Sequence, residues 1–459
     1  MEAEKKLAAY ITETQYEMLP SDIIDIAKRQ VLDVVGTTIA GMAAEGSKAI
    51  VEKVKDWGGK KEATILLYGG KVPAYNAVFA NSLMARALDY DSAMEPGLHF
   101  GACSVPSALA LSECMGKYSG REFLTALSVG AEVAARLNLS EWQYDGFDPT
   151  GVCGILGVSA IASRCLRLNT SQTLHALALA FTRSAGSVQS NIDAALSARL
   201  IQGYASREGL ISAELAGKGV TGPINFIEGV WGWFHLFGKD RGDPMNVTSE
   251  LGKRFEVRKT MFKKYPSCAG TFASTDAILA LAKEKNLVPE DIVRINVLVT
   301  PYLYKMVGHP FRIGDTPRVN AQFSIQYCVA NALRRRKPKL EHFDESNVMD
   351  PEVLGLIKRI SVDADAGLEK RGHTAARMEV ENREGDIHKK SIDIASGFPG
   401  NSLKEEDYLA HFWDCIEYAA EYFPRENAER LVELINKLEE LEDTRMLVSL
   451  LTEDISAPP

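Results

Sequence analysis

The sequence lacks the features that mark several large classes of protein. Its seven cysteines include no CxxC pair and no knuckle spacing, so we expect buried, reduced thiols rather than disulfides or a cluster site. No uninterrupted apolar run approaches the roughly 18 residues that a bilayer-spanning helix needs. The first ten residues, MEAEKKLAAY, have no long apolar stretch of the kind found in secretory signals. These absences predict a cytoplasmic protein that does not enter membranes.

Patterns that bind metals and nucleic acids are missing as well. The eight histidines include no HxH and no HExxH spacing, so we expect no metal site. The formal net charge of −9 at pH 7 argues against a nucleic-acid partner, because such a surface needs clustered Lys and Arg. The one basic run, residues 334–337, follows a helix-like segment, and we expect it to form a solvated helix end.

The composition that is present fits a folded and largely helical protein. With 459 residues, of which 46% are apolar and 25% charged, the chain is long enough for two domains. Helix-length apolar segments such as 21–40, 106–115 and 170–181 follow one another up to about residue 216. Ser21 with Asp22 is a good N-cap signal for the first of them. Gly, Ala and Ser crowd residues 154–162, which predicts close helix packing there.

The pattern changes after residue 264. The run IVRINVLVT from Ile292 alternates β-branched and other residues between two prolines, which predicts a strand. Three more strand candidates and two helix-like segments follow, namely Val362, 378–380 and 387–394, and 322–333 and 350–360. We therefore predict a mainly α fold. It has a large all-helical domain built from both chain ends, residues 1–264 and 396–459, and a smaller inserted α/β domain, residues 265–395.

Residues 88–99, LDYDSAMEPGLH, place three carboxylates and a histidine around a Pro-Gly turn, just before an apolar helix. A carboxylate beside an imidazole fixes the tautomer of the ring and suits it to carry protons near neutral pH. The same residues also fit a capped loop on the surface. On the residues alone, both interpretations stay open.

Two further clusters contain candidate binding groups. FKKYPSCAGT, residues 262–271, lies where the composition changes, and clefts between domains are common ligand sites. Lys263 or Lys264 could bind a carboxylate there or, if desolvated, act as a base, although adjacent lysines before a turn more commonly face solvent. YDGFDPTG, residues 144–151, ends at an apparent helix start whose N–H groups could hold an anion. The simpler interpretation is a turn capped by Asp148.

Taken together and in order, these clusters resemble the MmgE/PrpD family of 2-methylcitrate dehydratases, cis-aconitate decarboxylases and iminodisuccinate epimerases. Residues 88–99 resemble its LDFDD…HPG element, YDGFDPTG its GFHPTG element and FKKYPSCAGT its FKPYPCCRGTH element. Three more stretches, LAGKGVTGP, QFSIQY and SGFPGNSLKEED, resemble its RxGxTGP, KFSLPY and GxPxNPLSDEE elements. The resemblance spans nearly the whole chain, and six elements in order are far more specific than any one.

The resemblance implies a helical domain with an inserted α/β lid, a homodimer, and an enzyme that acts on small carboxylates without a cofactor. It implies catalytic roles for Asp89 and His99 and an active-site lysine, for which alignment to FKPYP favours Lys263 over Lys264. Tyr144 is a candidate for a second acid on the opposite face of the substrate. The candidates for binding substrate are Asp91, Asp148, Arg199 and Gln322.

The sequence departs from the family pattern at several charged positions. Asp148 stands where GFHPTG has its histidine, and it could deliver a proton at neutral pH only if burial raised its pKa by several units. The family's TKxLHPG element appears as SARLIQG, residues 197–203, without the lysine and histidine, and Ala269 stands where arginine is usual. A tricarboxylate would find fewer cationic partners here, although Arg199 and Lys264 could substitute.

We interpret the chain as a lyase that dehydrates or decarboxylates a small di- or tricarboxylate by moving a proton next to a carboxylate. In this hypothesis His99 moves the proton, Asp89 orients His99, and Lys263 or Lys264 stabilises the carbanion. An epimerase of a dicarboxylate such as iminodisuccinate is the alternative, with Tyr144 opposite His99. The third possibility is a non-catalytic helical dimer that acts as a binding or scaffold protein, and retention of Asp89 and His99 argues against it.

Overall fold

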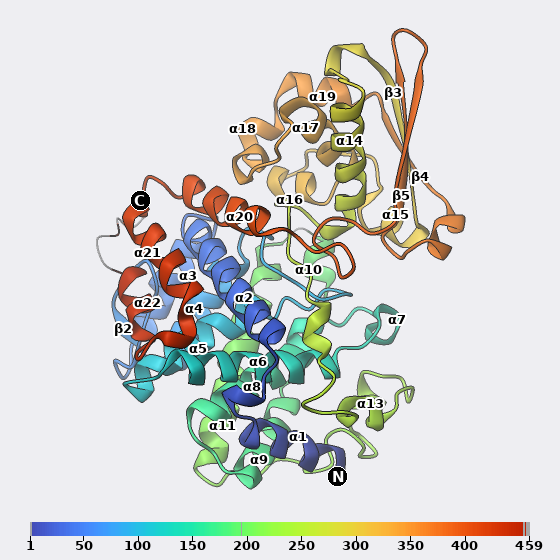
Figure 1. The fold of residues 1–459 in the computed structure, drawn as a ribbon. Helices are drawn as coiled ribbons and strands as arrows, with labels where there is room; N and C mark the ends of the chain where they lie inside the picture. The colour runs from blue at the N-terminus through green and yellow to red at the C-terminus, as the bar shows by residue number, and fades with distance from the viewer. Residues whose placement is uncertain (1, 194, 453–454, 456–459) are drawn as a thin grey trace. The chain divides into compact units, whose positions relative to one another are not determined.

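The computed structural model describes residues 2–193, 195–452 and 455, and most of them lie in α-helices. The predicted mainly α fold is therefore confirmed. The chain forms two compact units: unit 1 is Met1–Thr260 with Cys415–Pro459, and unit 2 is Met261–Asp414. Figure 1 shows the elements of both units along the chain. The predicted domain boundaries at 264/265 and 395/396 stay a prediction, because compactness alone does not show independent folding.

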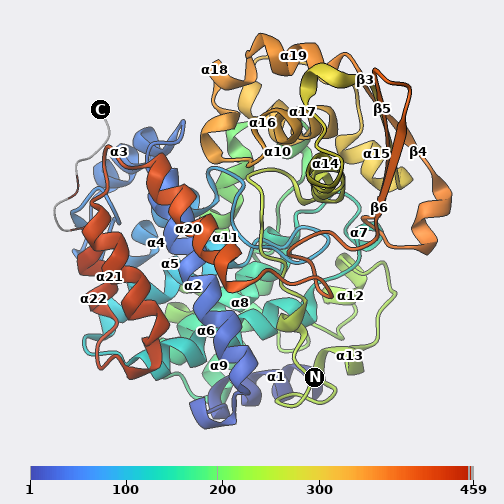
Figure 2. The ribbon, with the colours of Figure 1, turned by 45° about the horizontal axis from the view of Figure 1, so that its top comes forward.

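Unit 1 is built from helices that pack on one another. The helices α4 and α8 are central: α4 packs on α2, α5 and α11, and α8 packs on α5, α6, α9 and α11 (Figure 2). The helices of unit 1 are α1 (Glu2–Glu13), α2 (Ser21–Gly41), α3 (Ser47–Trp57), α4 (Ala74–Arg86), α5 (Gly101–Met115), α6 (Gly120–Leu137), α7 (Glu141–Tyr144), α8 (Ile155–Cys165), α9 (Thr170–Phe181), α10 (Gln189–Ile192), α11 (Leu200–Gly217), α12 (Trp233–Leu236), α13 (Pro244–Thr248), α21 (Arg425–Asn436) and α22 (Arg445–Leu450). A short hairpin, β1 (Ala63–Thr64) and β2 (Lys71–Val72), completes it.

The small residues of 154–162 do bring helices close together. A Cβ atom on Gly157 of α8 would lie 2.7 Å from the carbonyl oxygen of Gly130 on α6 and 2.5 Å from the ring of Phe100. Such distances are below any real Cβ contact. Glycine is therefore required for α8 to lie this close to α6 and to the residue before α5.

The predicted helices are found, but one lacks the predicted cap and another begins earlier than expected. Helix α2 begins at Ser21 as expected, yet no side chain caps it, and Asp22 instead accepts a hydrogen bond from Nε of Arg258 at 2.6 Å. That N-cap prediction is wrong, because a charged partner brought near by the fold competes for the carboxylate. Helix α5 begins at Gly101, five residues before the predicted start, and Pro106 lies inside it. Burial of the first turn stabilises the helix more than the loss of the one backbone hydrogen bond that proline cannot donate destabilises it.

Unit 2 contains a four-stranded sheet in the order β4-β3-β5-β6. Strand β3 is parallel to β4 and antiparallel to β5, and β5 is antiparallel to β6. Helix α14 packs against β5, β6 and α17, and Figure 2 looks almost along its axis. The elements of unit 2 are β3 (Ile292–Val299), β4 (Ile360–Ala364), β5 (Ala376–Asn382), β6 (Ile387–Ile392), α14 (Phe272–Glu284), α15 (Pro301–Val307), α16 (Pro317–Gln322), α17 (Ile325–Arg335), α18 (Glu345–Val348) and α19 (Pro351–Ile357). Helix α20 (Glu405–Tyr418) runs across the boundary between the units.

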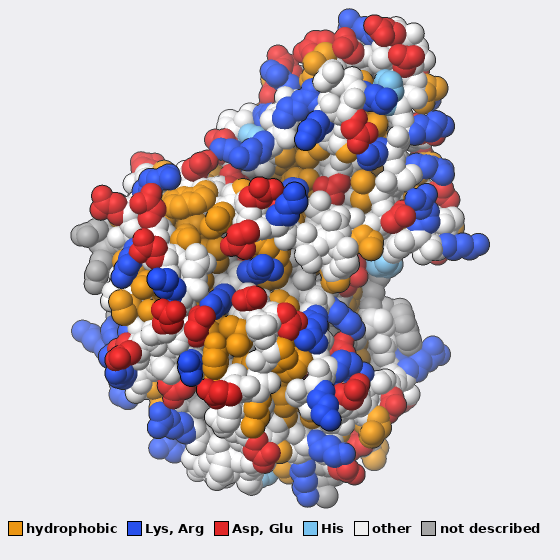
Figure 3. All heavy atoms as spheres, in the orientation of Figure 1, with side chains coloured by type: hydrophobic (Ala, Val, Ile, Leu, Met, Phe, Trp, Pro, Cys, Tyr) orange, Lys and Arg blue, Asp and Glu red, His pale blue; other side chains and the backbone are white. Residues whose placement is uncertain are grey.

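The basic run at residues 334–337 is mostly exposed and ends a helix, as expected. Within unit 2, Arg334 of this run pairs with Glu352 and Arg335 with Asp350. Two of its positive charges therefore have acidic partners. Acidic and basic side chains are interspersed on the face drawn in Figure 3. All seven cysteines are free, and six are buried as expected, whereas Cys114 is exposed. Among the described helices, none is both long and apolar enough to span a membrane.

Unit 2 contains a histidine that ties stability to pH. Nδ1 of His342 accepts a hydrogen bond from the N–H of Lys339 at 3.1 Å. Burial, followed by the charges of Arg335 and Lys339, lowers the pKa of His342 to about 4. An unfolded histidine titrates near pH 6.5, so the unfolded state binds more protons between about pH 6.5 and 4. Stability is therefore full above this window and falls as the pH decreases through it.

We expect His342→Asn to weaken this pH dependence, since asparagine can accept the same N–H without titrating. The wild type should lose about 1–2 kcal/mol more than the variant between pH 7 and about pH 4.5, after allowance for partial exposure. Urea unfolding of both proteins at the two pH values measures the difference. Equal losses in the two proteins would contradict this account of His342.

Candidate active site

Residues 88–99 form a buried loop between α4 and α5, which decides between the two interpretations of their sequence. The chain turns at Asp89, whose φ is 52°, and the amide of Asp89 donates to the carbonyl of Arg86 at 3.2 Å. The amide of Ser92 donates to Oδ2 of Asp33 on α2 at 2.9 Å. A tight turn then joins Met94 to Leu98 through paired backbone hydrogen bonds. The loop is thus held on several sides and is not a solvated cap.

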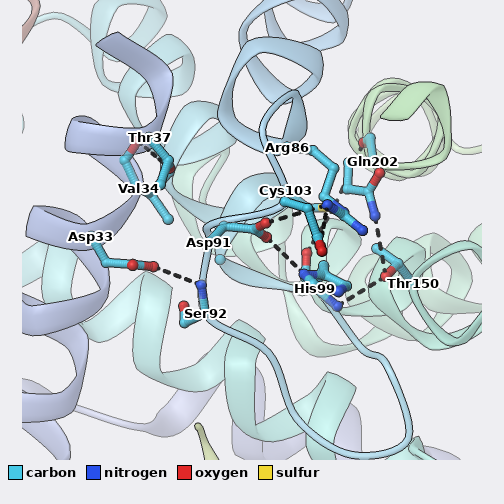
Figure 4. A network of polar contacts seen from close by, with 12 residues as sticks. Asp33, Val34, Thr37, Arg86, Asp91, Ser92, His99, Cys103, Thr150 and Gln202 are labelled. Carbon is cyan, nitrogen blue, oxygen red and sulfur yellow. Dashed lines mark hydrogen bonds and ion pairs between the residues drawn. The ribbon is translucent and has the colours of Figure 1, made fainter. Parts of the chain in front are cut away.

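His99 and Asp91 make a direct pair inside this loop. Nδ1 of His99 lies 3.0 Å from Oδ2 of Asp91, whose side chain is fully buried, while the His99 side chain keeps 13% of its surface exposed. An ionised Asp91 accepts from Nδ1–H, which leaves Nε2 as the nitrogen that can take a proton. The backbone N–H of His99 also donates to Oγ1 of Thr150 at 3.0 Å. Figure 4 shows the imidazole between Asp91 and Thr150.

The prediction that Asp89 orients His99 is wrong in its choice of residue. Asp89 pairs instead with the guanidinium of Arg86, with Nη1 of Arg86 2.7 Å from its Oδ1. The turn at Asp89 separates the two aspartates, so that Asp91 faces the imidazole and Asp89 the arginine. Asp91 was expected only to bind substrate; the structure makes it the partner of His99.

Arg86 is a buried charge that the sequence did not single out. It ends α4, and its Nη1 lies 3.8 Å from Oδ1 of Asp91 (Figure 4) and 2.7 Å from Oδ1 of Asp89. Burial alone would lower the pKa of Arg86, but the negative charges of Asp89, Asp91 and Asp148 outweigh burial and raise it. In the sequence, the sign of this ion pair is an arginine that stands three residues before an aspartate at the end of a helix.

One oxygen each of Asp89 and Asp91 and a ring nitrogen of His99 lie within 4.8 Å of one another, close enough to bind a metal ion. Arg86 already places a positive charge on both carboxylates. A divalent ion bound there would face the guanidinium at short range, which is unfavourable in a buried site. The expectation of no metal stays a prediction, and Arg86 is the physical argument for it.

A turn of π-helix, Thr150–Gly154, runs into α8 beside His99. Such turns are frequent at functional sites. Gly151 allows it here, because a Cβ on this residue would lie 1.9 Å from the carbonyl oxygen of Ala185. Oγ1 of Thr150 also lies 3.5 Å from Nε2 of Gln202, which is buried on α11 (Figure 4).

Asp148 precedes this turn and is almost completely buried. Its Oδ1 accepts the N–H of Thr150 at 2.8 Å and that of Gly151 at 3.3 Å. The simpler interpretation of a turn capped by Asp148 is thus confirmed, and these two N–H groups are not available to an external anion. Burial raises the pKa of Asp148, opposed in order by the N–H of Gly151, by His99, by the N–H of Thr150 and by Arg86.

Two other predicted residues of unit 1 make structural contacts. The hydroxyl of buried Tyr144 donates to Oδ1 of Asn138 at 2.7 Å and accepts from the N–H of Leu139 at 3.0 Å. Burial raises its pKa well above the usual value. Half-buried Arg199 donates from Nη1 to the carbonyl of Glu45 at 2.9 Å. Their predicted roles stay predictions.

The two lysines of unit 2 differ sharply in environment. Lys263 is buried, and its carbonyl oxygen lies 3.1 Å from Nδ1 of His411. Lys264 is one-third exposed and pairs with Asp407 at 3.3 Å. Gln322, also buried, donates to the carbonyl of Pro266 at 3.0 Å and so braces the turn after the lysines.

Comparison with known proteins identifies the family. The family model described as the MmgE/PrpD N-terminal domain matches residues 5–244, and that of the MmgE/PrpD C-terminal domain matches residues 265–440. The chain belongs to the MmgE/PrpD family. The predicted recognition is confirmed, and it covers nearly the whole chain.

Several curated relatives of this family member are named for one activity. The chain is 26% identical over 450 residues to cis-aconitate decarboxylase of Mus musculus, covering 94% of this chain and 90% of the relative. It is 25% identical over 448 residues to that of Homo sapiens, covering 94% and 91%. It is 23% identical over 475 residues to the cis-aconitate decarboxylase-like protein oryM of Aspergillus oryzae, covering 98% and 97%. This family member is thus similar over nearly its whole length to two proteins named cis-aconitate decarboxylase and to one named as similar to that enzyme.

Proposed function

We propose that this MmgE/PrpD family member is a cytoplasmic, homodimeric lyase that dehydrates or decarboxylates a small carboxylate without a cofactor. The observation that carries the proposal is the pair of Asp91 and His99, with its aspartate buried and its imidazole partly accessible. An oriented imidazole of this kind is the usual group for proton transfer at carbon near neutral pH. The lyase relatives support the reaction class.

In the proposed reaction the proton moves at the carbon next to a carboxylate. In a dehydration, Nε2 of His99 takes that proton, the C–H electron pair forms the alkene, and the hydroxyl leaves with its bonding electrons and takes a proton from solvent to become water. In a decarboxylation, the carbon loses CO₂, keeps the electron pair and takes a proton from His99. Asp91 holds the ring in one tautomer, and Arg86 partly offsets the negative charges of Asp91 and Asp89.

The experiment that tests this function is a substrate panel in D₂O followed by NMR. The panel contains hydroxy-, amino- and unsaturated di- and tricarboxylates. An alkene product or loss of CO₂ supports the lyase. Deuterium uptake with inversion and no elimination would replace the lyase by the epimerase, and no reaction with any member would favour a binding or scaffold protein.

We propose Lys263, rather than Lys264, as the lysine that stabilises negative charge on the substrate. The support is its burial, since a desolvated ammonium group interacts with an anion far more strongly than a solvated one. We expect Lys263→Met to lower kcat/KM about 10²–10³-fold, the range found for loss of one preorganised stabilising group. Lys264→Met is the matched control and should change it less than about threefold, because it removes a partly exposed ion pair. Steady-state kinetics of both folded variants measure this, and equal effects would contradict the choice.

A further inference from the structure

Gln202 is buried near the start of α11, in a part of the helix that packs tightly on α4. The following residue, Gly203, lies so close to α4 that a Cβ atom on it would be 2.8 Å from the carbonyl oxygen of Phe79. The hydroxyls of Ser206 and Ser82 join the same two helices through a hydrogen bond of 2.8 Å. This packing holds the backbone that carries Gln202 in a fixed place.

The side-chain amide of Gln202 reaches the immediate surroundings of His99. Its Nε2 lies 3.5 Å from Oγ1 of Thr150, and the backbone N–H of His99 donates to the same oxygen at 3.0 Å. Figure 4 shows the amide extending from α11 toward Thr150, beside the imidazole. A substrate bound at His99 therefore lies in the neighbourhood of this amide.

The oxygen of the Gln202 amide has no partner in the fold. Oε1 is buried, and among the described residues no group makes a hydrogen bond to it. A buried acceptor without a donor costs free energy, because it has lost its bonds to water and gained none in return. A ligand that donates a hydrogen bond to Oε1 recovers this cost.

A hydroxyl group has the chemistry that this oxygen needs. It donates to an amide oxygen, and it also accepts from amide N–H groups, so it suits the side chain in either orientation of the amide. A carboxylate or keto oxygen at neutral pH has no proton to donate to Oε1. A methylene or alkene carbon in the same place would leave Oε1 unsatisfied.

We propose that Gln202 binds the hydroxyl group of the substrate and so makes the site select hydroxycarboxylates over carboxylates without this group. The inference rests on the proposed function, and within it favours dehydration, because only dehydration needs a hydroxyl group. The TKxLHPG element that residues 197–203 resemble has proline at the position of Gln202. Proline has no side-chain hydrogen-bonding group, so this means of selection belongs to this chain rather than to the element.

The test uses two pairs of ligands whose members differ in one hydroxyl group. Malate, as each enantiomer, is compared with succinate, and citrate is compared with tricarballylate. L-aspartate, which carries an ammonium group in place of the hydroxyl, tests whether charge is recognised instead. Isothermal titration of the full-length protein gives a Kd for each. We expect the hydroxy member of at least one pair to bind about 10–100-fold more tightly, since an unsatisfied buried acceptor costs this much.

The decisive comparison is between Gln202→Met and Gln172→Met. Methionine has the length of glutamine but no acceptor oxygen, so the preference for the hydroxy member should fall to about threefold or less in Gln202→Met. The Kd of the member without the hydroxyl should stay within about threefold of the wild type, because the rest of the site is intact.

Gln172 on α9 is the matched control because the fold uses both ends of its amide. Oε1 of Gln172 accepts from the N–H of Asn169 at 3.1 Å, and Nε2 donates to the carbonyl of Gly217 at 3.4 Å. Gln172→Met should therefore leave the preference unchanged.

Four results would overturn the inference. The first is a wild type that binds none of these ligands or shows no preference in either pair, which is what an ordered water on Oε1 would give. The others are a preference that survives in Gln202→Met, an equal loss of preference in Gln172→Met, and tighter binding of L-aspartate than of either malate. The first result needs no variant, so the inference stays testable even if Gln202→Met does not fold.

Failure of the proposed function gives a different result. The ligands then bind with the expected preference and respond to Gln202→Met, but the protein turns over no member of the substrate panel. A protein that decarboxylates an unsaturated acid and shows no preference within either pair keeps the proposed function and contradicts the role of Gln202.

Discussion

Replacing His99 by asparagine is expected to lower kcat by about 10²–10⁴, the usual contribution of a general acid or base. Asparagine keeps a donor near Asp91 at similar volume, so the fold should survive while Nε2, the proton-carrying atom, is lost. Asp91→Asn should lower kcat by a comparable factor, because the ring then loses its orienting acceptor. The double variant should be little worse than either single one, since the two residues act as a unit.

The chain offers a matched control for these variants. His235 pairs with Asp240 at 2.7 Å, as His99 pairs with Asp91, but this second pair is largely exposed. His235→Asn should leave kcat within about threefold of the wild type, since an exposed pair contributes little. If His99→Asn retained turnover within about tenfold, or if effects of the two single variants simply multiplied, the assignment would be wrong.

Replacing Arg86 by methionine is expected to lower the free energy of unfolding by about 3–5 kcal/mol, the cost of removing one partner from a buried ion pair. Asp89 and Asp91 would stay buried without the positive charge of Arg86. Methionine fills most of the volume, so the loss reports charge rather than a cavity. Denaturant unfolding measures it, with the far-UV spectrum as the check on folding.

Two further variants serve as controls for the effect of Arg86→Met on the free energy of unfolding. Arg258→Met removes an exposed arginine that binds Asp22 through two nitrogens, and should cost no more than about 1 kcal/mol. Arg86→Lys keeps the charge but loses the planar guanidinium, so it should recover part of the stability. A loss in Arg86→Met no larger than in Arg258→Met would show that Arg86 does not compensate the aspartates.

The sequence predicted the helical class and the strands of unit 2 because both depend on periodicity, which is local. It was less accurate about helix ends: Asp22 binds Arg258 from a segment more than two hundred residues away rather than capping its own helix. It also chose Asp89 over Asp91 as the partner of His99. That choice depends on the backbone turn at Asp89, which spacing along the chain does not reveal.

Arg86 could not be found from the sequence for a related reason. An arginine in an apolar helix is ordinary until three carboxylates from two segments are brought around it. Asp148 was identified as the cap of a turn from its local sequence, and its Oδ1 does accept the two amides of that turn. Lys263 and Lys264 are adjacent and alike in sequence, and only their burial separates them.

The most direct test of the central claim, that His99 moves the substrate proton, is solvent deuterium exchange at the carbon next to the carboxylate. The measurement is made in D₂O with the substrate that the panel identifies, on wild type, His99→Asn and His235→Asn. We predict deuterium at that carbon, in substrate or product, for the wild type and His235→Asn, and at least a hundredfold slower incorporation for His99→Asn. Incorporation by His99→Asn at the wild-type rate would contradict the account.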